Sequence, residues 1–306
     1  MTEDTTDYSE KTRAIYHRQH KKVAADKVAM ERFINMFSTE YFGLPDQYFA
    51  DKKILDAGCG DTAKVIIALA KMGAAQLTGL DLGTDFIEVA QKTLGTYGIP
   101  QNKVTLKSGT VLELPFEDNQ FDFVCCHGVL VHLNTLDEVS RAFSELARVT
   151  KPGGHLYTVF GLTGGLLEDA VYPALRAYYQ DNPDFRSFID TISPSVFETT
   201  LALIGDEMKA HTGEIIPPSG LNALFDTDLC VTIQNIIQAP VRLKVEERFI
   251  LNHYTENGFT EIRRLQRYVK RKNIRKYAAP LHYNIHNDVS KLIYGSGNLE
   301  FIAPKK

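Results

Sequence analysis

Few cysteines, no long apolar run and no secretion signal limit what this chain can be. The cysteines are Cys59, Cys125, Cys126 and Cys230. They form neither C-x-x-C pairs nor the Cys/His spacing of a zinc site, so neither a metal centre nor a disulfide framework is indicated. No apolar run approaches the roughly 20 residues that span a bilayer, and residues 1–7 are acidic and polar, unlike a secretion signal. We therefore expect a soluble protein of the reducing cytoplasm, with no membrane partner.

The chain also lacks a large excess of either charge. It has 34 Lys and Arg against 38 Asp and Glu, a formal net charge of −4 at pH 7. Such a balance gives no general attraction to nucleic acid or to an anionic membrane, so any contact of that kind would have to be local. With 306 residues, 44% of them hydrophobic, the chain can form one large domain or two small ones around a sizeable core.

The stretch KILDAGCG, residues 53–60, is the centre of the sequence pattern. It predicts the end of a buried strand and then a tight turn that opens a helix. Glycine suits such a turn because a ligand approaches the bare backbone and because the turn visits dihedrals that a Cβ forbids. The first N–H groups of the helix are left to meet a polar ligand. The next run, residues 76–81, predicts a second strand that ends in Asp81, where a carboxylate can accept hydrogen bonds from a ribose.

These features indicate a nucleoside-binding unit but leave two kinds of ligand open. Gly58-x-Gly60-x-x-Ala63 followed by Asp81 also satisfies the dinucleotide pattern of a nicotinamide oxidoreductase. Asp56, however, would place a carboxylate where the pyrophosphate of a dinucleotide has to sit, and like charges repel. The same carboxylate suits a ligand with a positive charge at that end.

Four segments, in this order and spacing, resemble the class I S-adenosylmethionine (SAM) dependent methyltransferases. They are ILDAGCGDTAK, LTGLDL, GTVLELPFEDNQFDFVCCHGVLVHL and SELARVTKPGGHLYTVF. The resemblance covers residues 53–160, with a weaker echo from residue 247 to the C-terminus. It implies an α/β fold with a doubly wound, mostly parallel, seven-stranded Rossmann-like sheet whose last two strands form a hairpin. It also implies SAM as cofactor, S-adenosylhomocysteine (SAH) as product and no metal.

The resemblance assigns cofactor contacts residue by residue. The expected contacts are Tyr16, Asp56, Gly58, Cys59, Gly60, Asp81, Leu82, Thr110, Val111 and His127. The glycine loop would give backbone to the methionyl group and Asp56 would meet its ammonium, directly or through water. Asp81 would bind the ribose hydroxyls, with Leu82 near the adenine. Capping of a helix or turn is the alternative for both carboxylates.

One position departs from the family pattern. An acidic residue usually follows the glycine of the adenine loop, but here Thr110 follows Gly109. Contact with the base would then shift to backbone N–H groups or to a neighbour. Thr110 and Val111 are expected at the base, and His127 beside the sulfonium.

Catalysis on an activated sulfonium methyl requires mainly that donor and acceptor are held in line and that water is kept out. A general base helps only if the acceptor is a hydroxyl or a protonated amine. The candidates are His132, His127 and Tyr172, and the alternative for His132 is capping of the next helix. Weaker pocket candidates are Tyr178, His253, His282 and Tyr283.

Three regions are expected along the chain. Residues 1–45 would form an N-terminal helical lid, in which Tyr16 and Tyr8 cover the cofactor or only anchor the helix. Residues 46–160 and 246–306 would form the SAM-binding catalytic domain. Residues 161–245 break the repeating pattern and predict a helical cap insertion for the substrate. Its aromatic residues are Tyr172, Tyr178, Tyr179, Phe185, Phe188, Phe197 and Phe225; they would suit a small molecule, or packing between the subunits of a homodimer.

The sequence thus favours methyl transfer to an O, N or S atom of a small molecule. Transfer to RNA or protein is one alternative, although an aromatic cap is unlike the open basic groove that such a polymer needs. A SAM-binding protein without catalysis is another. The basic stretch, residues 263–276, indicates either a solvated face or an anion site. Its aromatic residues are too sparse to favour a nucleic acid partner.

Overall fold

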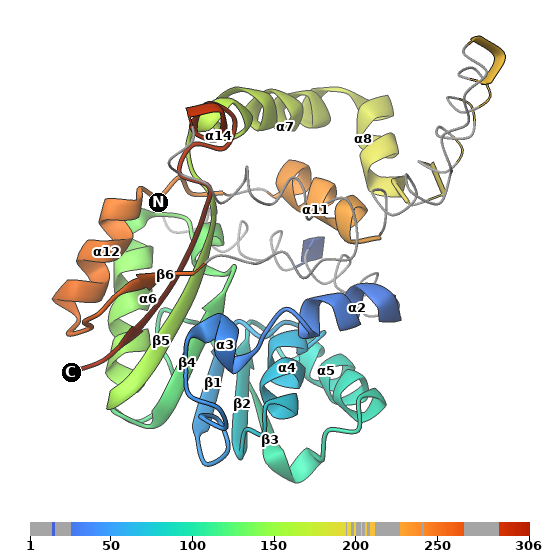
Figure 1. The fold of residues 1–306 in the computed structure, drawn as a ribbon. Coiled ribbons are helices and arrows are strands. Elements are labelled where there is room, and N and C mark those ends of the chain that lie inside the picture. The colour runs from blue at the N-terminus through green and yellow to red at the C-terminus, as the bar shows by residue number, and fades with distance from the viewer. Residues whose placement is uncertain are drawn as a thin grey trace.

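The structure is a computed structural model in which a twisted sheet lies between two layers of helices (Figure 1). It describes residues 26–193, 227–239, 242–265 and 288–306, and also positions 14, 15, 195, 196, 199, 203, 206 and 209–211. None of the helices in these ranges is long and apolar enough to cross a membrane.

The sheet has seven strands in the order β3-β2-β1-β4-β5-β7-β6. Their bounds are β1 Lys53–Ala57, β2 Gln76–Asp81, β3 Val104–Ser108, β4 Phe121–His127, β5 Thr150–Leu162, β6 Arg263–Arg264 and β7 Asn298–Pro304. The pairs among β1 to β5 are parallel, whereas β7 runs antiparallel to both β5 and β6. This confirms the expected doubly wound, mostly parallel Rossmann-like sheet with a terminal hairpin.

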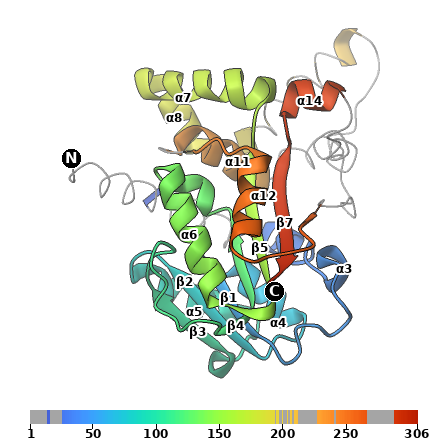
Figure 2. The same cartoon turned by 90° about the vertical axis from the view of Figure 1, so that its left-hand side faces the viewer.

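Helices cover both faces of the sheet. On one face lie α2 Lys27–Ile34, α3 Thr39–Phe42, α4 Lys64–Lys71 and α5 Asp85–Thr96, and on the other α6 Leu136–Val149 and α12 Glu247–Glu256 (Figures 1 and 2). Strand β1 serves both layers because its side chains alternate: Ile54 packs with the α4 side and Leu55 with the α6 side, both fully buried. Burial of such a side chain stabilises the fold by about 1.5–3 kcal/mol.

Residues 109–120, expected as the adenine loop, join β3 to β4 without a helix and make an isolated bridge between Thr110 and Glu113. Pro115 removes a backbone donor, and Asn119 adopts a left-handed φ of 54°, so the segment follows turn chemistry.

The cap helices lie beyond the carboxyl ends of the parallel strands (Figures 1 and 2). They are α7 Tyr172–Asp181, α8 Pro183–Thr191, α11 Thr227–Gln238 and α14 Asp288–Tyr294, preceded by a π-helical turn, η3 Leu167–Val171. Strands β1 and β4 are neighbours, but the chain leaves them in opposite directions along the sheet. A crevice forms outside the carboxyl ends at such a switch point, and this is where open α/β sheets bind ligands.

The described part of the N-terminal segment packs onto the sheet edge near this switch point. Met30, Ile34 and Phe37 are buried in the core beside α4. The rings of Phe33 and Phe37 both meet the His127 ring edge-on, at centroid distances of 5.4 and 5.8 Å. This segment therefore borders the site, whereas Tyr8 and Tyr16 of the expected lid lie outside the described residues.

Candidate functional site

A cavity of about 690 Å³ opens at the switch point. Its walls include most of the predicted site residues, namely Gly58, Cys59, Gly60, Asp81, Leu82, Thr110, Val111, His127 and His132. Asp56 lies behind the glycine loop and is 1% exposed. Tyr172 is not among the described residues that line the cavity, and Tyr16 falls outside the described ranges.

The glycine loop has a conformation that other residues would not adopt. Gly58 and Gly60 have φ values of +94° and +62°, both in the left-handed region. The N–H groups of Gly58 and Cys59 donate to the Leu80 carbonyl at 2.7 and 3.0 Å, which fixes the loop to β2. A Cβ on Gly58 would lie 2.1 Å from Cγ2 of Val129. A side chain at Gly58 would therefore collide with Val129, so the loop stays bare backbone here.

The carboxylate of Asp81 is held by backbone groups at the end of β2. One oxygen accepts from Gly60 N at 2.7 Å and the other from Leu82 N at 2.8 Å. Each carboxylate oxygen has a second lone pair, and the half-buried side chain lines the cavity. Asp81 can thus accept hydrogen bonds from a pair of ribose hydroxyls without moving.

Asp56 carries a buried carboxyl group. Burial, and then the charge of Asp81, raise its pKa to about 7. Neither oxygen has a hydrogen-bond partner of normal geometry among the described residues, although the Cys125 thiol lies beside it. An orphaned carboxyl group behind a glycine cradle fits a ligand that brings an ammonium group, as SAM does.

The expected adenine end of the cavity is apolar on one side. Thr110 and Val111 line it together with Leu82, Phe86 and Leu112. The Thr110 hydroxyl accepts the N–H of Leu112 at 3.2 Å, so the residue that replaces the usual acid caps its own turn. Sequence reasoning missed Phe86, although its place in the first turn of α5, directly after β2, could have indicated it.

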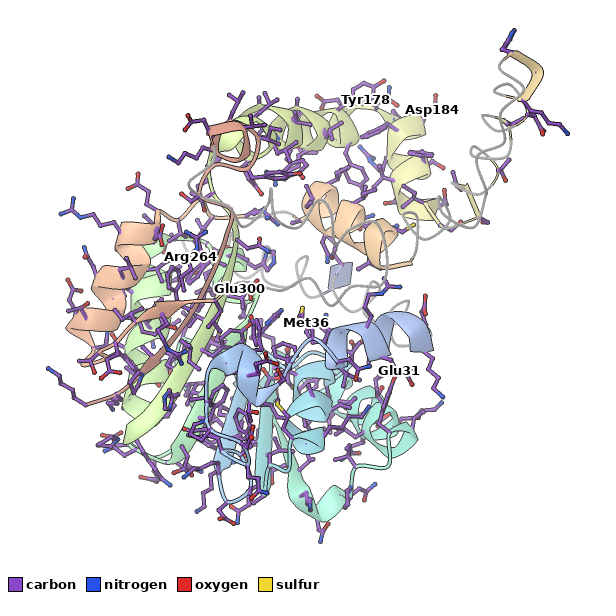
Figure 3. The ribbon with its side chains drawn as sticks, viewed as in Figure 1. Glu31, Met36, Tyr178, Asp184, Arg264 and Glu300 are labelled. Carbon is purple, nitrogen blue, oxygen red and sulfur yellow. The ribbon has the colours of Figure 1, made fainter. Side chains whose placement is uncertain are left out.

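His127 takes part in a chain of polar contacts that ends at a buried carboxylate. The Tyr157 hydroxyl lies 3.4 Å from His127 Nδ1 and donates to Glu300 Oε2 at 3.3 Å. Tyr41 also donates to that oxygen, at 2.5 Å. Glu300 is fully buried on β7 and is labelled in Figure 3.

The Tyr157 hydroxyl has a single proton, and the atom that receives it sets the donor and acceptor roles of the other contacts. If the proton is given to Glu300, the hydroxyl can only accept from His127, which places the imidazole proton on Nδ1. The other ring nitrogen, Nε2, then carries the lone pair. The contacts are long, as catalytic hydrogen bonds often are before ligands close a site.

His132 lines the cavity within a short helical turn, η2 Leu130–His132, and its N–H donates to Val129 O at 2.9 Å. It is not the cap of the next helix. Thr135 caps α6, accepting from Glu138 N at 3.1 Å, while Glu138 accepts from Asn134 N at 2.7 Å. This resembles a capping box, except that Glu138 reaches the residue before the N-cap. The alternative of a capping role for His132 is therefore wrong.

The cap contributes polar residues to the cavity where the sequence suggested aromatic ones. From the expected cap, Gly161, Asn235 and Arg242 line it. Tyr172 instead lies near the ion pair of Arg242 and Glu168, and burial raises its pKa. Tyr178 and Phe188 are 52% and 44% exposed, and Figure 3 labels Tyr178 on the outer layer of the cap. The Tyr179 hydroxyl donates to Asp190 Oδ1 at 2.7 Å, and the Phe185 ring packs against Tyr178 with centroids 5.0 Å apart. Phe197 and Phe225 lie outside the described residues.

Other predicted candidates lie elsewhere. His253 is on α12, where its Nε2 meets the Ser140 hydroxyl at 2.6 Å, away from the cavity. His282 and Tyr283 are outside the described ranges, as is the basic stretch beyond Leu265. Of its described part, Arg263 donates to the Phe42 carbonyl at 2.7 Å and Arg264 pairs with Glu247 at 3.1 Å. These two arginines tie elements of the fold together.

Comparison with known proteins gives a match over the segment that builds most of these walls. Residues 55–158 match a family described as a methyltransferase domain. Methyltransferase GfsG of Streptomyces halstedii is 29% identical over 129 residues, which cover 42% of this chain and 45% of that protein. Demethylmenaquinone methyltransferase of Bacillus cereus is 36% identical over 104 residues, 33% of this chain and 41% of that protein.

The chain spans about half the length of the curated relatives it matches. Among solved structures, a SAM-dependent methyltransferase from Methanosarcina mazei aligns with a TM-score of 0.48 and 19% identity over 88% of this chain and 97% of that one.

Proposed function

Since the chain carries a class I SAM-dependent methyltransferase domain, we propose that it transfers a methyl group from SAM to an O, N or S nucleophile of a small molecule. The observation that carries the proposal is one cavity whose walls join the glycine loop and Asp81 to Asn235 and Arg242 of the cap. Its volume of about 690 Å³ lies within the range of roughly 300–1,000 Å³ typical of small-molecule sites.

The cofactor half of the proposal uses residues in fixed positions. Bound SAM would supply a methyl group already activated by the sulfonium. The Gly58–Gly60 backbone receives the methionyl group, and Asp56 balances its ammonium. Asp81, held at both oxygens, accepts from the ribose hydroxyls. Leu82, Thr110 and Val111 enclose the base.

The acceptor half of the proposal depends on position more than on acid–base chemistry. Apolar residues of the cavity wall, including Val129, Val131 and Phe160, exclude water around the reacting atoms. Holding the acceptor in line with the methyl group supplies most of the acceleration. For a hydroxyl or protonated amine, His127 is the first candidate base, because Tyr157 occupies its Nδ1 side and leaves the lone pair on Nε2. His132 is the second.

A small-molecule acceptor is favoured over a polymer by the cap, which supplies part of the cavity wall. The name of the Bacillus cereus relative also specifies a small molecule, demethylmenaquinone. The methylated atom is not fixed by these observations, so the proposal includes O, N and S acceptors.

Calorimetric titration with SAM, SAH and NAD(H) tests the cofactor, and transfer of labelled methyl from SAM to phenols, carboxylates, amines and thioethers tests catalysis. We expect micromolar binding of SAM and SAH, no binding of NAD(H), and transfer to at least one small-molecule class. Binding of NAD(H) alone would overturn the proposal in favour of a dinucleotide site. Binding of SAM without transfer to any class would favour a SAM-binding protein that does not catalyse.

A further inference from the structure

Arg242 lies in the cavity wall on the cap side, and its side chain is only 12% exposed. Its Nη2 lies 2.8 Å from Oε1 of Glu168, a residue of η3 that is 2% exposed. The contact is an ion pair without hydrogen-bond geometry, since Oε1 of Glu168 has no hydrogen-bond partner among the described residues. An arginine already held beside a buried carboxylate loses little further conformational freedom when a ligand arrives. The guanidinium is therefore preorganised at the edge of the cavity.

The backbone on either side of the guanidinium is built to hold it there. The N–H of Leu243, the next residue, donates to the Val131 carbonyl at 2.8 Å and so joins this segment to the turn that carries His132. Across from it, a Cβ on Gly161 would lie 2.4 Å from Nη2 of Arg242. The absence of a side chain at the end of β5 is what leaves room for the arginine.

The ion pair with Glu168 does not use all the hydrogen-bond donors of Arg242. Glu168 also faces Arg176 at 3.9 Å, so its single charge is shared between two guanidinium groups. The buried Nε of Arg242 has no hydrogen-bond partner in the part of the chain that the structure describes. The same holds for Oδ1 of Asn235, which also lines the cavity. Buried polar groups without partners cost about 1–3 kcal/mol each, which a ligand would recover.

Acidic residues of the cavity wall are segregated from Arg242. Asp61 follows β1, Asp81 ends β2 and Asp85 begins α5, all at the cofactor end, and Glu138 accepts the N–H of Asn134 ahead of α6. The cap side thus presents a cation and amides against an apolar floor that includes Val131 and Phe160. This combination fits an organic acid better than a neutral or cationic ligand.

We propose that Arg242 forms an anion subsite that binds a carboxylate group of the methyl acceptor, so that the substrates are small organic acids with an apolar body. The inference rests on the proposed function and narrows its substrate class. The planar guanidinium matches a carboxylate, and Asn235 lines the same cavity. Glu168 and Gly161 position the arginine and do not contact the substrate.

Matched pairs of acids and primary amides test the subsite: benzoate and benzamide, phenylacetate and phenylacetamide, hexanoate and hexanamide. Each is titrated into the full chain saturated with SAH, with thermal unfolding as a second readout. We expect at least one acid to bind wild type about tenfold or more tightly than its amide, the value of a charge-assisted hydrogen bond. In Arg242→Gln that preference disappears, and in Arg242→Lys part of it remains.

Two further variants distinguish a specific loss of the subsite from a general loss of structure. Gly161→Ala keeps the charge of Arg242 but occupies its space, so the acid preference should fall there as well. Arg248→Gln removes an exposed arginine of α12 that does not line the cavity and should keep the preference. SAH affinity, measured in every variant, should stay within about twofold of wild type.

The outcomes separate a failure of the Arg242 subsite from a failure of the proposed methyltransferase function. If SAH binds wild type but no acid is preferred over its amide, or if the preference survives Arg242→Gln, the subsite is overturned and the proposed function stands. If SAH does not bind wild type, the proposed function fails and the subsite fails with it.

Discussion

The two sides of the cavity are built on different principles. The cofactor side, residues 56–60 and 81–82, uses backbone conformation: left-handed glycines, N–H groups bonded to Leu80, and a carboxylate fixed by two amides. The cap side uses side chains brought together from distant positions, such as Arg242 on Glu168. In the proposed function, the first side would bind the cofactor, which does not change with the acceptor, and the second would bind the acceptor.

This difference accounts for where the family match ends. A backbone cradle requires particular residues at fixed spacing, because other residues cannot adopt its dihedrals. A side-chain subsite can be assembled from many positions as long as charge and volume are kept. The family match ends at residue 158, three residues before Gly161, where the cap side begins.

A pair of phenylalanine variants sharpens the comparison at the level of stability. Phe143 of α6 is fully buried between Phe160 and Tyr254, whereas Phe188 of α8 is 44% exposed. Phe143→Ala should reduce the free energy of unfolding by about 3–5 kcal/mol, and Phe188→Ala by only about 0.5 kcal/mol. Urea unfolding followed by circular dichroism measures both.

Equal losses in the two variants would contradict the idea that the sheet and its helices carry the stability while the outer cap does not. An unchanged m-value in both variants is the control, since it shows that the same surface unfolds.

The sequence predicted those elements whose signal is local. The buried run of β1, the helical spacing of Val65, Ile66 and Leu69 in α4, and the acid at the end of β2 each follow from residues close together in the chain. The sheet order could then be inferred by resemblance.

The cap side could not be predicted for a physical reason. Arg242 and Glu168 are far apart in sequence, and neither lies in a repeating pattern. Nothing local in Gly161 marks it as the glycine that makes room for a guanidinium. The aromatic residues of the cap were the stronger signal, yet Tyr178 and Phe188 face solvent. Hydrophobicity indicates burial on average, and it does not say which buried or exposed place a residue takes.

Asp81→Ala tests the cofactor side most directly. Loss of an acceptor already aligned by Gly60 and Leu82 should weaken SAH binding about 100-fold, because the ribose hydroxyls lose charge-assisted hydrogen bonds of about 1.5–3 kcal/mol each. Calorimetry measures the affinity. Asp137→Ala removes an exposed carboxylate of α6 outside the cavity wall and should bind SAH as wild type does. Unchanged affinity in Asp81→Ala would remove the nucleoside assignment from this end of the cavity.

Asp56→Asn should have a smaller effect, about tenfold on SAH affinity, together with a change in proton release. The pKa of Asp56, raised to about 7 by burial and by Asp81, leaves the group about half protonated at pH 7. An ammonium bound beside it favours the carboxylate, so SAH binding should release up to about half a proton. Calorimetry in two buffers of different ionisation enthalpy measures the release, which should vanish in Asp56→Asn.

The same group gives a pH dependence of stability with a defined sign. Its pKa in the folded protein lies above the ordinary value of 3.8, so the folded state binds more protons than the unfolded chain between about pH 4 and pH 7. Its contribution to the free energy of unfolding is therefore complete below that range and is lost as the pH rises through 7. Asp56→Asn should have a flatter profile without ligand, and an identical slope in the two proteins would contradict the raised pKa.

Tyr157→Phe has the smallest expected effect and tests whether the cofactor side extends into catalysis. Without the hydroxyl, His127 Nδ1 loses its link to Glu300, so the preference for the Nδ1–H tautomer should fall by a factor of about 2–10, the worth of one net hydrogen bond. Nitrogen NMR of the imidazole rings measures the tautomer ratio. Tyr48→Phe is a matched control, because the Tyr48 hydroxyl meets Nδ1 of His155 at 2.8 Å and should alter only that ring. If the tautomer ratio of His127 is unchanged in Tyr157→Phe, the contacts through Tyr157 to Glu300 do not orient the imidazole. His127 is then no stronger a candidate than His132 for the general base.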